Sequence, residues 1–200
     1  MKPFTHNNPC GEGTFSQVSS VRVVSDFFPQ ATMLRAEFDQ QIAGSTVAGG
    51  ITPLNYVYRA DAHQFLSASA SRIFTATILG SFIDTLSRWA ENELGTSHVS
   101  TPQVRVYING CSRQLLTDDV AAAWHFIFSL TQLNSQTKPR DSGSLATYSP
   151  TTADFGQLLI TKFRFNQLIV HLVSHSYRIE AHRTTMNPLE GVILLDGYLW

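Results

Sequence analysis

Two polar segments, far apart in the chain, could place a carboxylate beside a histidine. The first is Tyr-Ile-Asn-Gly-Cys-Ser-Arg-Gln-Leu-Leu-Thr-Asp-Asp, which contains Asp118, and the second is Val-Ser-His-Ser-Tyr-Arg-Ile-Glu, which contains His175. Two histidines and one carboxylate form a facial triad that binds a divalent metal and leaves positions open for other ligands. Asp118 and His175 could supply two of these ligands, but Leu116 stands where the first histidine of a His-x-Asp pair would lie. The sequence therefore predicts a site whose usual metal set is incomplete.

Other histidines could replace the missing ligand. His125 lies on the strand expected after Asp118, and His171 precedes His175 by four residues. If a metal is bound, we expect its ligands to be Asp118, His125 and His175. The alternative for His125 is a partly buried strand histidine that is hydrogen-bonded to a carbonyl group, because most histidines near a pocket only make hydrogen bonds.

An arginine and a tyrosine precede the first polar segment and could bind an anionic cosubstrate. Arg105 and Tyr107 alternate with Val104 and Val106, so they share one face of an expected strand. A guanidinium that points into a sheet interior is costly unless it meets a carboxylate. The alternative places Arg105 on the solvated face, paired with a neighbouring acid.

Proton transfer is a second chemistry that these residues could perform. Asp196 interrupts an otherwise apolar terminal strand, and with His175 and Asp118 it could form a catalytic set of carboxylates and imidazole. If the Asp196 face is external instead, this carboxylate is simply solvated. Aromatic side chains expected to line an apolar substrate pocket are Tyr56, Tyr58, Trp124 and Tyr198.

Bulk properties limit the partners and the compartment. The chain has 200 residues, 43% of them hydrophobic, and a net charge of -1. This length favours one domain over residues 21–200, preceded by a flexible arm over residues 1–20 that lacks hydrophobic periodicity. No basic surplus is available to bind nucleic acid, and no apolar run is long enough to span a membrane. Two cysteines form no disulfide framework, so we expect a cytoplasmic protein.

The order of the expected elements indicates how these residues are positioned. Helical spacing of apolar residues predicts helices at about 29–41 and within 71–94, the second ended by Gly95, and glycines predict a loop over 44–53. Alternating patterns predict strands at 21–23, 54–58, 103–108, 124–130, 157–165, 167–172, 176–180 and 192–200. Helices followed by strands favour an α+β domain in which a β sandwich or jelly roll carries supporting helices on one side.

The polar segments and their surroundings resemble one family of enzymes. Its likeness is found in Glu-Leu-Gly at 93–95, Tyr-x-Asn-Gly-Cys at 107–111, the turn with Asp118, Phe-Asn-Gln-Leu at 165–168, His175 and the closing strand at 191–200. In this order the motifs resemble bacterial members of the Fe(II)/2-oxoglutarate-dependent oxygenase superfamily. The resemblance implies a double-stranded β-helix, a jelly-roll or cupin-like barrel with a metal site at its open end.

The same resemblance assigns residues by position. Asp118 matches the carboxylate ligand, His175 matches the distal histidine, and Leu116 occupies the place of the proximal histidine. Val192 occupies the place of the basic residue that binds the distal carboxylate of 2-oxoglutarate, and valine cannot make that charge-assisted contact.

These two substitutions leave three hypotheses. The first is an enzyme that keeps the barrel but performs a non-redox cyclisation, isomerisation or elimination of a small-molecule biosynthetic intermediate, without a required cofactor. The second is a working hydroxylase or desaturase that uses Fe(II) and 2-oxoglutarate with an atypical ligand set. The third is a non-catalytic relative that binds a ligand or partner protein. The sequence leaves the substrate and the oligomeric state open.

Overall fold

The computed structural model of the protein describes residues 20–47, 52–59, 63–109, 111–116, 121–132, 143–148, 157–180 and 185–200. Residues 1–19, which make up almost all of the expected N-terminal arm, and Asp118 lie outside these ranges. No helix in the described ranges is long and apolar enough to cross a membrane.

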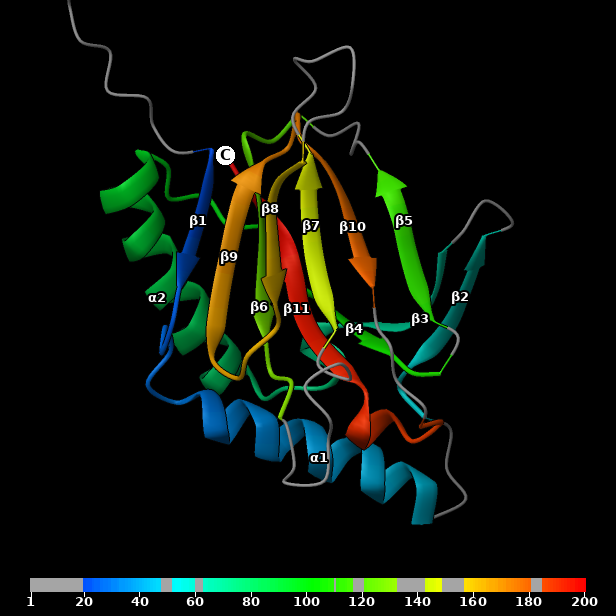
Figure 1. Cartoon of the computed structure of the whole chain (residues 1–200). Coiled ribbons are helices and arrows are strands. Elements are labelled where there is room, and N and C mark those ends of the chain that lie inside the picture. The colour runs from blue at the N-terminus through cyan, green and yellow to red at the C-terminus, as the bar shows by residue number, and fades with distance from the viewer. Residues whose placement is uncertain are drawn as a thin grey trace, which may run out of the picture.

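Antiparallel strands form two facing layers (Figure 1). Hydrogen bonds connect the strands in the order β1-β9-β6-β11-β4-β3-β5-β10-β7-β8, and β2 pairs with β3. The strands are β1 Val21–Val24, β2 Asn55–Arg59, β3 His63–Ser69, β4 Gln103–Tyr107, β5 Ser112–Leu116, β6 Trp124–Ser129, β7 Ser144–Tyr148, β8 Gln157–Lys162, β9 Gln167–Leu172, β10 Ser176–Glu180 and β11 Val192–Leu199. The larger sheet, β1-β9-β6-β11-β4-β3 with β2 beside β3, and the smaller sheet, β5-β10-β7-β8, constitute a double-stranded β-helix, which confirms the predicted fold class.

Two helices lie outside the strands, and the first of them runs beneath the lower ends of the strands (Figure 1). They are α1, Ala31–Val47, and α2, Ala76–Leu94, and short 3-10 helices are found at Ala70–Arg72 (η1) and Pro188–Glu190 (η3). Gly95 ends α2 in the left-handed conformation with φ 72°, as the sequence predicted. Because glycine has no Cβ, it adopts this conformation with little strain.

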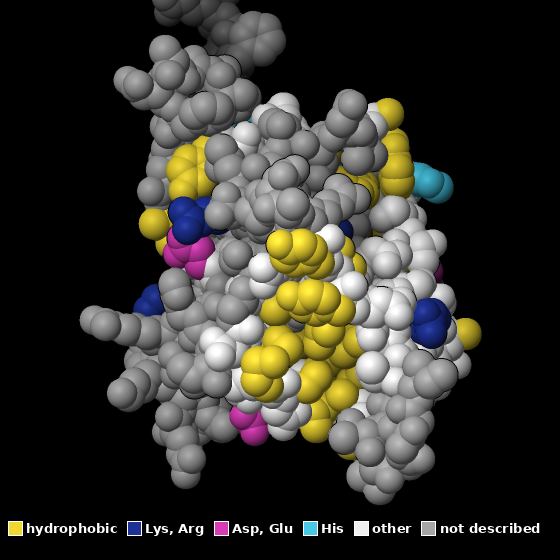
Figure 2. Space-filling view, turned by 90° about the vertical axis from the view of Figure 1, so that its right-hand side faces the viewer, with side chains coloured by type: hydrophobic (Ala, Val, Ile, Leu, Met, Phe, Trp, Pro, Cys, Tyr) yellow, Lys and Arg dark blue, Asp and Glu magenta, His cyan; other side chains and the backbone are white. Residues whose placement is uncertain are grey.

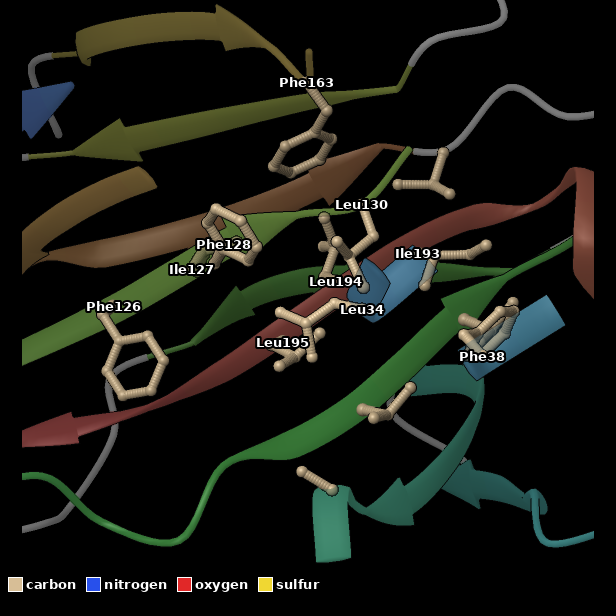
Figure 3. Packing of buried hydrophobic residues seen from close by; sticks show 14 of the residues in the cluster. Leu34, Phe38, Phe126, Ile127, Phe128, Leu130, Phe163, Ile193, Leu194 and Leu195 are labelled. Carbon is tan, nitrogen blue, oxygen red and sulfur yellow. The ribbon is translucent and has the colours of Figure 1, made fainter. Parts of the chain in front are cut away.

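Alternation along the larger sheet separates an apolar outer face from a polar inner face. On the outer face Phe128 contacts Phe82 of α2, with ring centroids 4.9 Å apart, and Phe82 also contacts Phe27 and Phe28. Figure 3 shows part of the buried cluster, with side chains from α1, β6 and β11. Since this face is filled by helix packing, chemistry is confined to the interior between the two sheets.

A buried arginine fixes α1 against the end of the barrel. Arg35 is 6% exposed, and its guanidinium donates to the carbonyl oxygens of Leu130 and Leu189 as well as to the Asp39 carboxylate. These bonds tie α1 to the end of β6 and to the η3 turn that leads into β11. The helix therefore sets the position of the strand that carries Asp196.

Some predicted boundaries were wrong. The loop expected at residues 44–53 was wrong over its first four residues, because α1 continues through Gly44 to Val47. A glycine on an exposed helix face costs only about 1 kcal/mol, which is too little to end the helix. Strands β3, β5 and β7 were not predicted, since their alternation is broken by serines and by neighbouring turn residues.

Candidate active site

The inner face of the larger sheet carries several buried polar side chains, among them His125, His171 and Asp196. In the pairing register Tyr198 lies opposite His125, and His125 lies opposite His171. Arg105 lies opposite Leu194, which shares its face of β11 with Asp196. Directly opposed residues share a face of an antiparallel sheet, so four neighbouring strands bring these groups together.

An ion pair connects β4 to β11 in this interior. The Arg105 guanidinium lies 2.8 Å from Oδ2 of Asp196, and the Asp196 side chain is only 2% exposed. Burial acts to lower the pKa of Arg105, but the Asp196 carboxylate and three nearby tyrosines raise it above its ordinary value, so the arginine stays charged. The sequence left open whether Arg105 faces solvent or the interior, and the structure places it inside.

Two histidines continue the polar network from Asp196. Nε2 of His125 lies 3.5 Å from Oδ2 of Asp196, and Nδ1 of His125 lies 3.0 Å from Nε2 of His171. Nδ1 of His171 lies 3.0 Å from the carbonyl oxygen of Leu172. Burial, and then the neighbouring His125, lower the pKa of His171 to about 3, so His171 is neutral at physiological pH.

Aromatic rings enclose the network on both sides. His125 lies between Tyr177 and Tyr198, with ring centroids 4.9 and 5.2 Å away and tilted by 33° and 36°. Tyr177 belongs to β10 of the opposite sheet, and Phe65 of β3 lies under the Arg105 guanidinium. These rings lower the local dielectric, which strengthens the electrostatic interactions among the charged groups.

Tyr107 and His175 border this cluster. Burial raises the pKa of Tyr107, so it remains a neutral phenol. His175 lies in the turn before β10 and is 5% exposed, and its Nδ1 atom is buried with no hydrogen-bond partner in the described part of the chain. Burial lowers the pKa of His175, which favours the neutral imidazole. A neutral ring with a free nitrogen can accept a proton or bind a cation.

Leu116 ends β5 next to the strand that follows His175. Its Cα pairs with that of Tyr177, two residues beyond His175, so the end of β5 lies beside the histidine turn. Asp118, expected at the start of the following turn, lies outside the described residues.

The described residues do not fit the metal and cosubstrate that the resemblance implies. No group of three potential metal-binding side chains is found in the ranges that the structure describes. Leucine at 116 has no donor atom, and the ring nitrogens of His125 face His171 and Asp196 instead of His175. Val192 occupies the position where a basic residue would bind 2-oxoglutarate. Its buried side chain lies close to Gly143, because a Cβ added at Gly143 would be 2.9 Å from Cγ2 of Val192.

Three of the expected pocket aromatics lie elsewhere. Tyr56 and Tyr58 are 57% and 63% exposed, because they share a face of the β2-β3 hairpin with Gln64 and Leu66 while Phe65 faces the interior. Figure 2 shows hydrophobic side chains gathered on the side of the molecule where β2 lies. Trp124 is buried on the face of β6 opposite to that of His125. Of the four predicted aromatics, only Tyr198 contacts the polar cluster.

Sequence reasoning missed the roles of His171 and Tyr177. The sequence relates His171 to His175 only by spacing, although alternation along 124–129 and 167–172 turns His125 and His171 away from the faces of Phe126 and Val170. Their pairing depends on the register between β6 and β9, which alternation alone does not determine.

No protein-family model matches the chain, and no curated protein matches it in sequence. Solved structures do match. A prolyl-4-hydroxylase from Pseudomonas putida has a TM-score of 0.59 and 18% identity over 90% of this chain and 91% of that one. Two structures from nogalamycin biosynthesis are the non-heme alpha ketoglutarate dependent epimerase SnoN, with a TM-score of 0.63 and 11% identity, and the carbocyclase SnoK, with 0.62 and 12%. They cover 89% and 90% of this chain, and 75% and 78% of their own chains.

Proposed function

We propose that this chain, which has the double-stranded β-helix fold of the Fe(II)/2-oxoglutarate-dependent oxygenase superfamily, is an enzyme that acts on a small-molecule biosynthetic intermediate. The reaction is a non-redox isomerisation, cyclisation or elimination, which takes a proton from one atom of the substrate and gives a proton to another. The enzyme acts in the cytoplasm and binds neither nucleic acid nor membrane.

The observation that carries this proposal is the buried Arg105–Asp196–His125 cluster. A metal-binding barrel interior needs donor atoms that converge on one point, whereas these groups pair with one another. A carboxylate between an arginine and a histidine in a low-dielectric interior is a proton-transfer group. The two positions that would hold iron and 2-oxoglutarate carry the aliphatic residues Leu116 and Val192, which supports a reaction that needs neither.

The roles follow from the environments of the groups. His175 serves as the base, because burial lowers its pKa and leaves the neutral ring with a free Nδ1. Asp196, which lies between Arg105 and His125, is assigned to the second proton transfer, and Asp118 is assigned to orient the substrate beside His175. Tyr107 and Tyr198 hold the substrate against Asp196 and exclude water.

The similar solved structures support the choice of reaction. SnoN is described as an epimerase and SnoK as a carbocyclase, so the same barrel accommodates stereochemical inversion and ring closure in those proteins. Both are described as alpha ketoglutarate dependent. This chain carries Leu116 and Val192 at the two positions where the resemblance expects a metal ligand and a basic residue for that cosubstrate.

The test begins with deletion of the gene in its own host and identification of the small molecule that accumulates. Purified protein treated with a chelator should convert this molecule to a product of the same elemental composition, or of that composition less water. His175→Gln and Asp196→Asn variants should lose this conversion. Unchanged biological activity after Ala replacement of both Asp118 and His175 would instead indicate a non-catalytic binding protein.

One observation favours a second candidate, an Fe(II)/2-oxoglutarate oxygenase with an atypical ligand set. His175 occupies the distal histidine position and presents a buried nitrogen without a partner. In this case the residues that would hold iron are Asp118 and His175 with water or a substrate atom, and the iron would supply oxidative chemistry. Anaerobic loading with Fe(II), followed by oxygen and 2-oxoglutarate, should then yield stoichiometric iron and release succinate.

A further inference from the structure

Strand β2 lies at an edge of the larger sheet. It pairs with β3 from Asn55 to Arg59, and no other strand pairs with it in the part of the chain that the structure describes. Figure 1 shows β2 as the outermost strand on the right-hand side of the molecule. Because the N–H and C=O groups of successive residues alternate between the two sides of a strand, those that point away from β3 can pair with a further strand.

The strands at the two ends of the main strand order differ from β2. β1 carries the charged Arg22 within its four residues, and β8 ends with Lys162 and changes register against β7 between Thr147 and Tyr148. Charged side chains and irregular pairing are common protections of an exposed sheet edge. The three central residues of β2 are uncharged, and its pairing with β3 runs over five positions without a shift. β2 is therefore the edge that is best suited to pair with another strand.

Aromatic side chains lie beside this edge. Tyr56 and Tyr58 are 57% and 63% exposed, and they share the outer face of the hairpin with the partly buried Leu66. The Tyr56 hydroxyl donates to Oε1 of Gln64 at 3.3 Å, which holds this ring against the hairpin. Figure 2 shows hydrophobic side chains gathered on this side of the molecule. Exposed tyrosines next to an unprotected strand edge are typical of a protein–protein interface.

The sequence of β2 is complementary to an antiparallel copy of itself. Asn-Tyr-Val-Tyr-Arg reads almost the same from both ends. When two copies pair antiparallel about Val57, Tyr56 of each copy lies opposite Tyr58 of the other. Both aromatic pairs are then on one face of the joined sheet, and such cross-strand pairs stabilise antiparallel sheets. In this register Arg59 lies opposite Asn55, so no residue of the strand meets a like charge.

We propose that β2 is the interface of a homodimer, in which the β2 strands of two copies pair antiparallel about a two-fold axis at Val57 and join the larger sheets. The two-fold axis closes the assembly, because each copy uses the same edge for the same contact. Tyr56 and Tyr58 lie on the face of the hairpin opposite to that of Phe65, which faces the barrel interior. The dimer therefore does not depend on the proposed function of the interior.

The exposed area indicates how strong this dimer is. A tyrosine side chain buries roughly 200 Å² when fully covered, so at 57% and 63% exposure the four rings of the dimer offer about 500 Å². A stable interface buries about 1,200 Å² or more, and the rings supply less than half of this area. We expect a weak, reversible dimer with a dissociation constant of about 10–100 µM.

The first test is sedimentation velocity of the full-length protein at concentrations below and above this range. The protein should sediment as a monomer at the low concentrations and as a dimer at the high ones. A wild-type protein that stays monomeric at every concentration would overturn the proposal, and the β2 edge would then be left for a different partner.

Hydrogen exchange of the wild-type protein tests the position of the interface without any substitution. The amides of residues 55–59 should exchange more slowly above the dissociation constant than below it, whereas those of β1 and β8 should not change. Equal exchange of the β2 amides at both concentrations would exclude β2 as the interface.

Charge substitutions test the register. In the double variant Tyr56→Lys with Tyr58→Lys, like charges lie opposite each other at two places, which should raise the dissociation constant at least about tenfold. The variant Tyr56→Lys with Tyr58→Glu places opposite charges there and should dimerise more tightly than the all-lysine variant. Equal dissociation constants for these two variants would exclude pairing about Val57. Ile160→Lys is the control, because Ile160 is 60% exposed on β8 and its replacement should leave the association unchanged.

Mixing separates a loss of pairing from a loss of folding. The variant Tyr56→Glu with Tyr58→Glu should also be monomeric, but an equimolar mixture with the all-lysine variant should form a heterodimer, since every facing pair then has opposite charges. A mixture of the two variants, each with the wild-type circular dichroism spectrum, that stays monomeric would contradict the proposed interface.

Discussion

The Arg105 guanidinium and the Asp196 carboxylate, 2.8 Å apart on neighbouring strands, neutralise each other inside the barrel. The arginine that could have held an anionic cosubstrate is therefore engaged by the chain itself. Removing one member of such a pair leaves a buried charge without its partner, which costs far more than the intact pair contributes.

An Asp196→Asn variant should lower the free energy of unfolding by about 3–5 kcal/mol, because Arg105 loses its counter-charge. Urea denaturation at neutral pH measures this change. The control is the double variant Arg105→Met with Asp196→Leu, in which no charge is left unpaired and the loss should be smaller than in the single variant. A double variant that is less stable than Asp196→Asn would contradict this account of the pair.

Acid should destabilise the fold through His171. Its folded pKa of about 3 lies below the value of 6.5 for an unperturbed histidine, so the unfolded state binds more protons as the pH falls. The free energy of unfolding therefore decreases below about pH 6.5 and continues to decrease to about pH 3. From about pH 7.5 to about pH 5, His171 alone should account for about 2 kcal/mol. A His171→Gln variant should lose this part of the pH dependence in urea denaturation, and an unchanged slope would exclude His171 as its source.

Much of the fold could be predicted because local patterns agree with the global arrangement. Apolar residues at helical spacing, with Gly95 as the stop signal, define α2, and the alternation of Val104, Val106 and their neighbours defines β4. The hairpin strand β3 was missed because its polar positions include Ser67 and Ser69, which are also common in turns. Burial between two strands, which the sequence does not display, makes this segment a strand.

The candidate site was less predictable because its contacts depend on register. The sequence assigns Asp196, Arg105 and His125 to three different candidate sets, and only the pairing of β11 with both β4 and β6 brings them together. Tyr56 and Tyr58 were expected in the pocket but face solvent. A one-residue shift in the alternation of a strand decides whether an aromatic ring lines the barrel or faces solvent.

The basic residue that the resemblance expects at position 192 should not be restorable by one substitution. Val192 packs against Gly143 so closely that a Cβ added at Gly143 would lie 2.9 Å from Cγ2 of Val192, which leaves no room for a methyl group there. We expect Val192→Arg to destabilise the protein by more than about 2 kcal/mol through overpacking and an unpaired charge, without conferring binding of 2-oxoglutarate. Val192→Ile is the control for size alone and should cost less. Calorimetric binding of 2-oxoglutarate by a stable Val192→Arg protein would show that the pocket is roomier than this packing implies.

The metal position, in contrast, should respond to a single change, because the backbone at the end of β5 already lies beside the histidine turn. Leu116→His supplies the imidazole that the ligand set lacks, and it should lower the dissociation constant for Fe(II) at least about tenfold relative to wild type. Leu116→Phe is the matched control, since it adds a ring of similar size without a donor nitrogen. Anaerobic titration of all three proteins with Fe(II) measures the difference. If Leu116→His binds no more tightly than Leu116→Phe, residue 116 does not occupy a ligand position. The pairing of Leu116 with Tyr177 would then place an ordinary strand end beside His175 instead of a metal site that has lost one ligand.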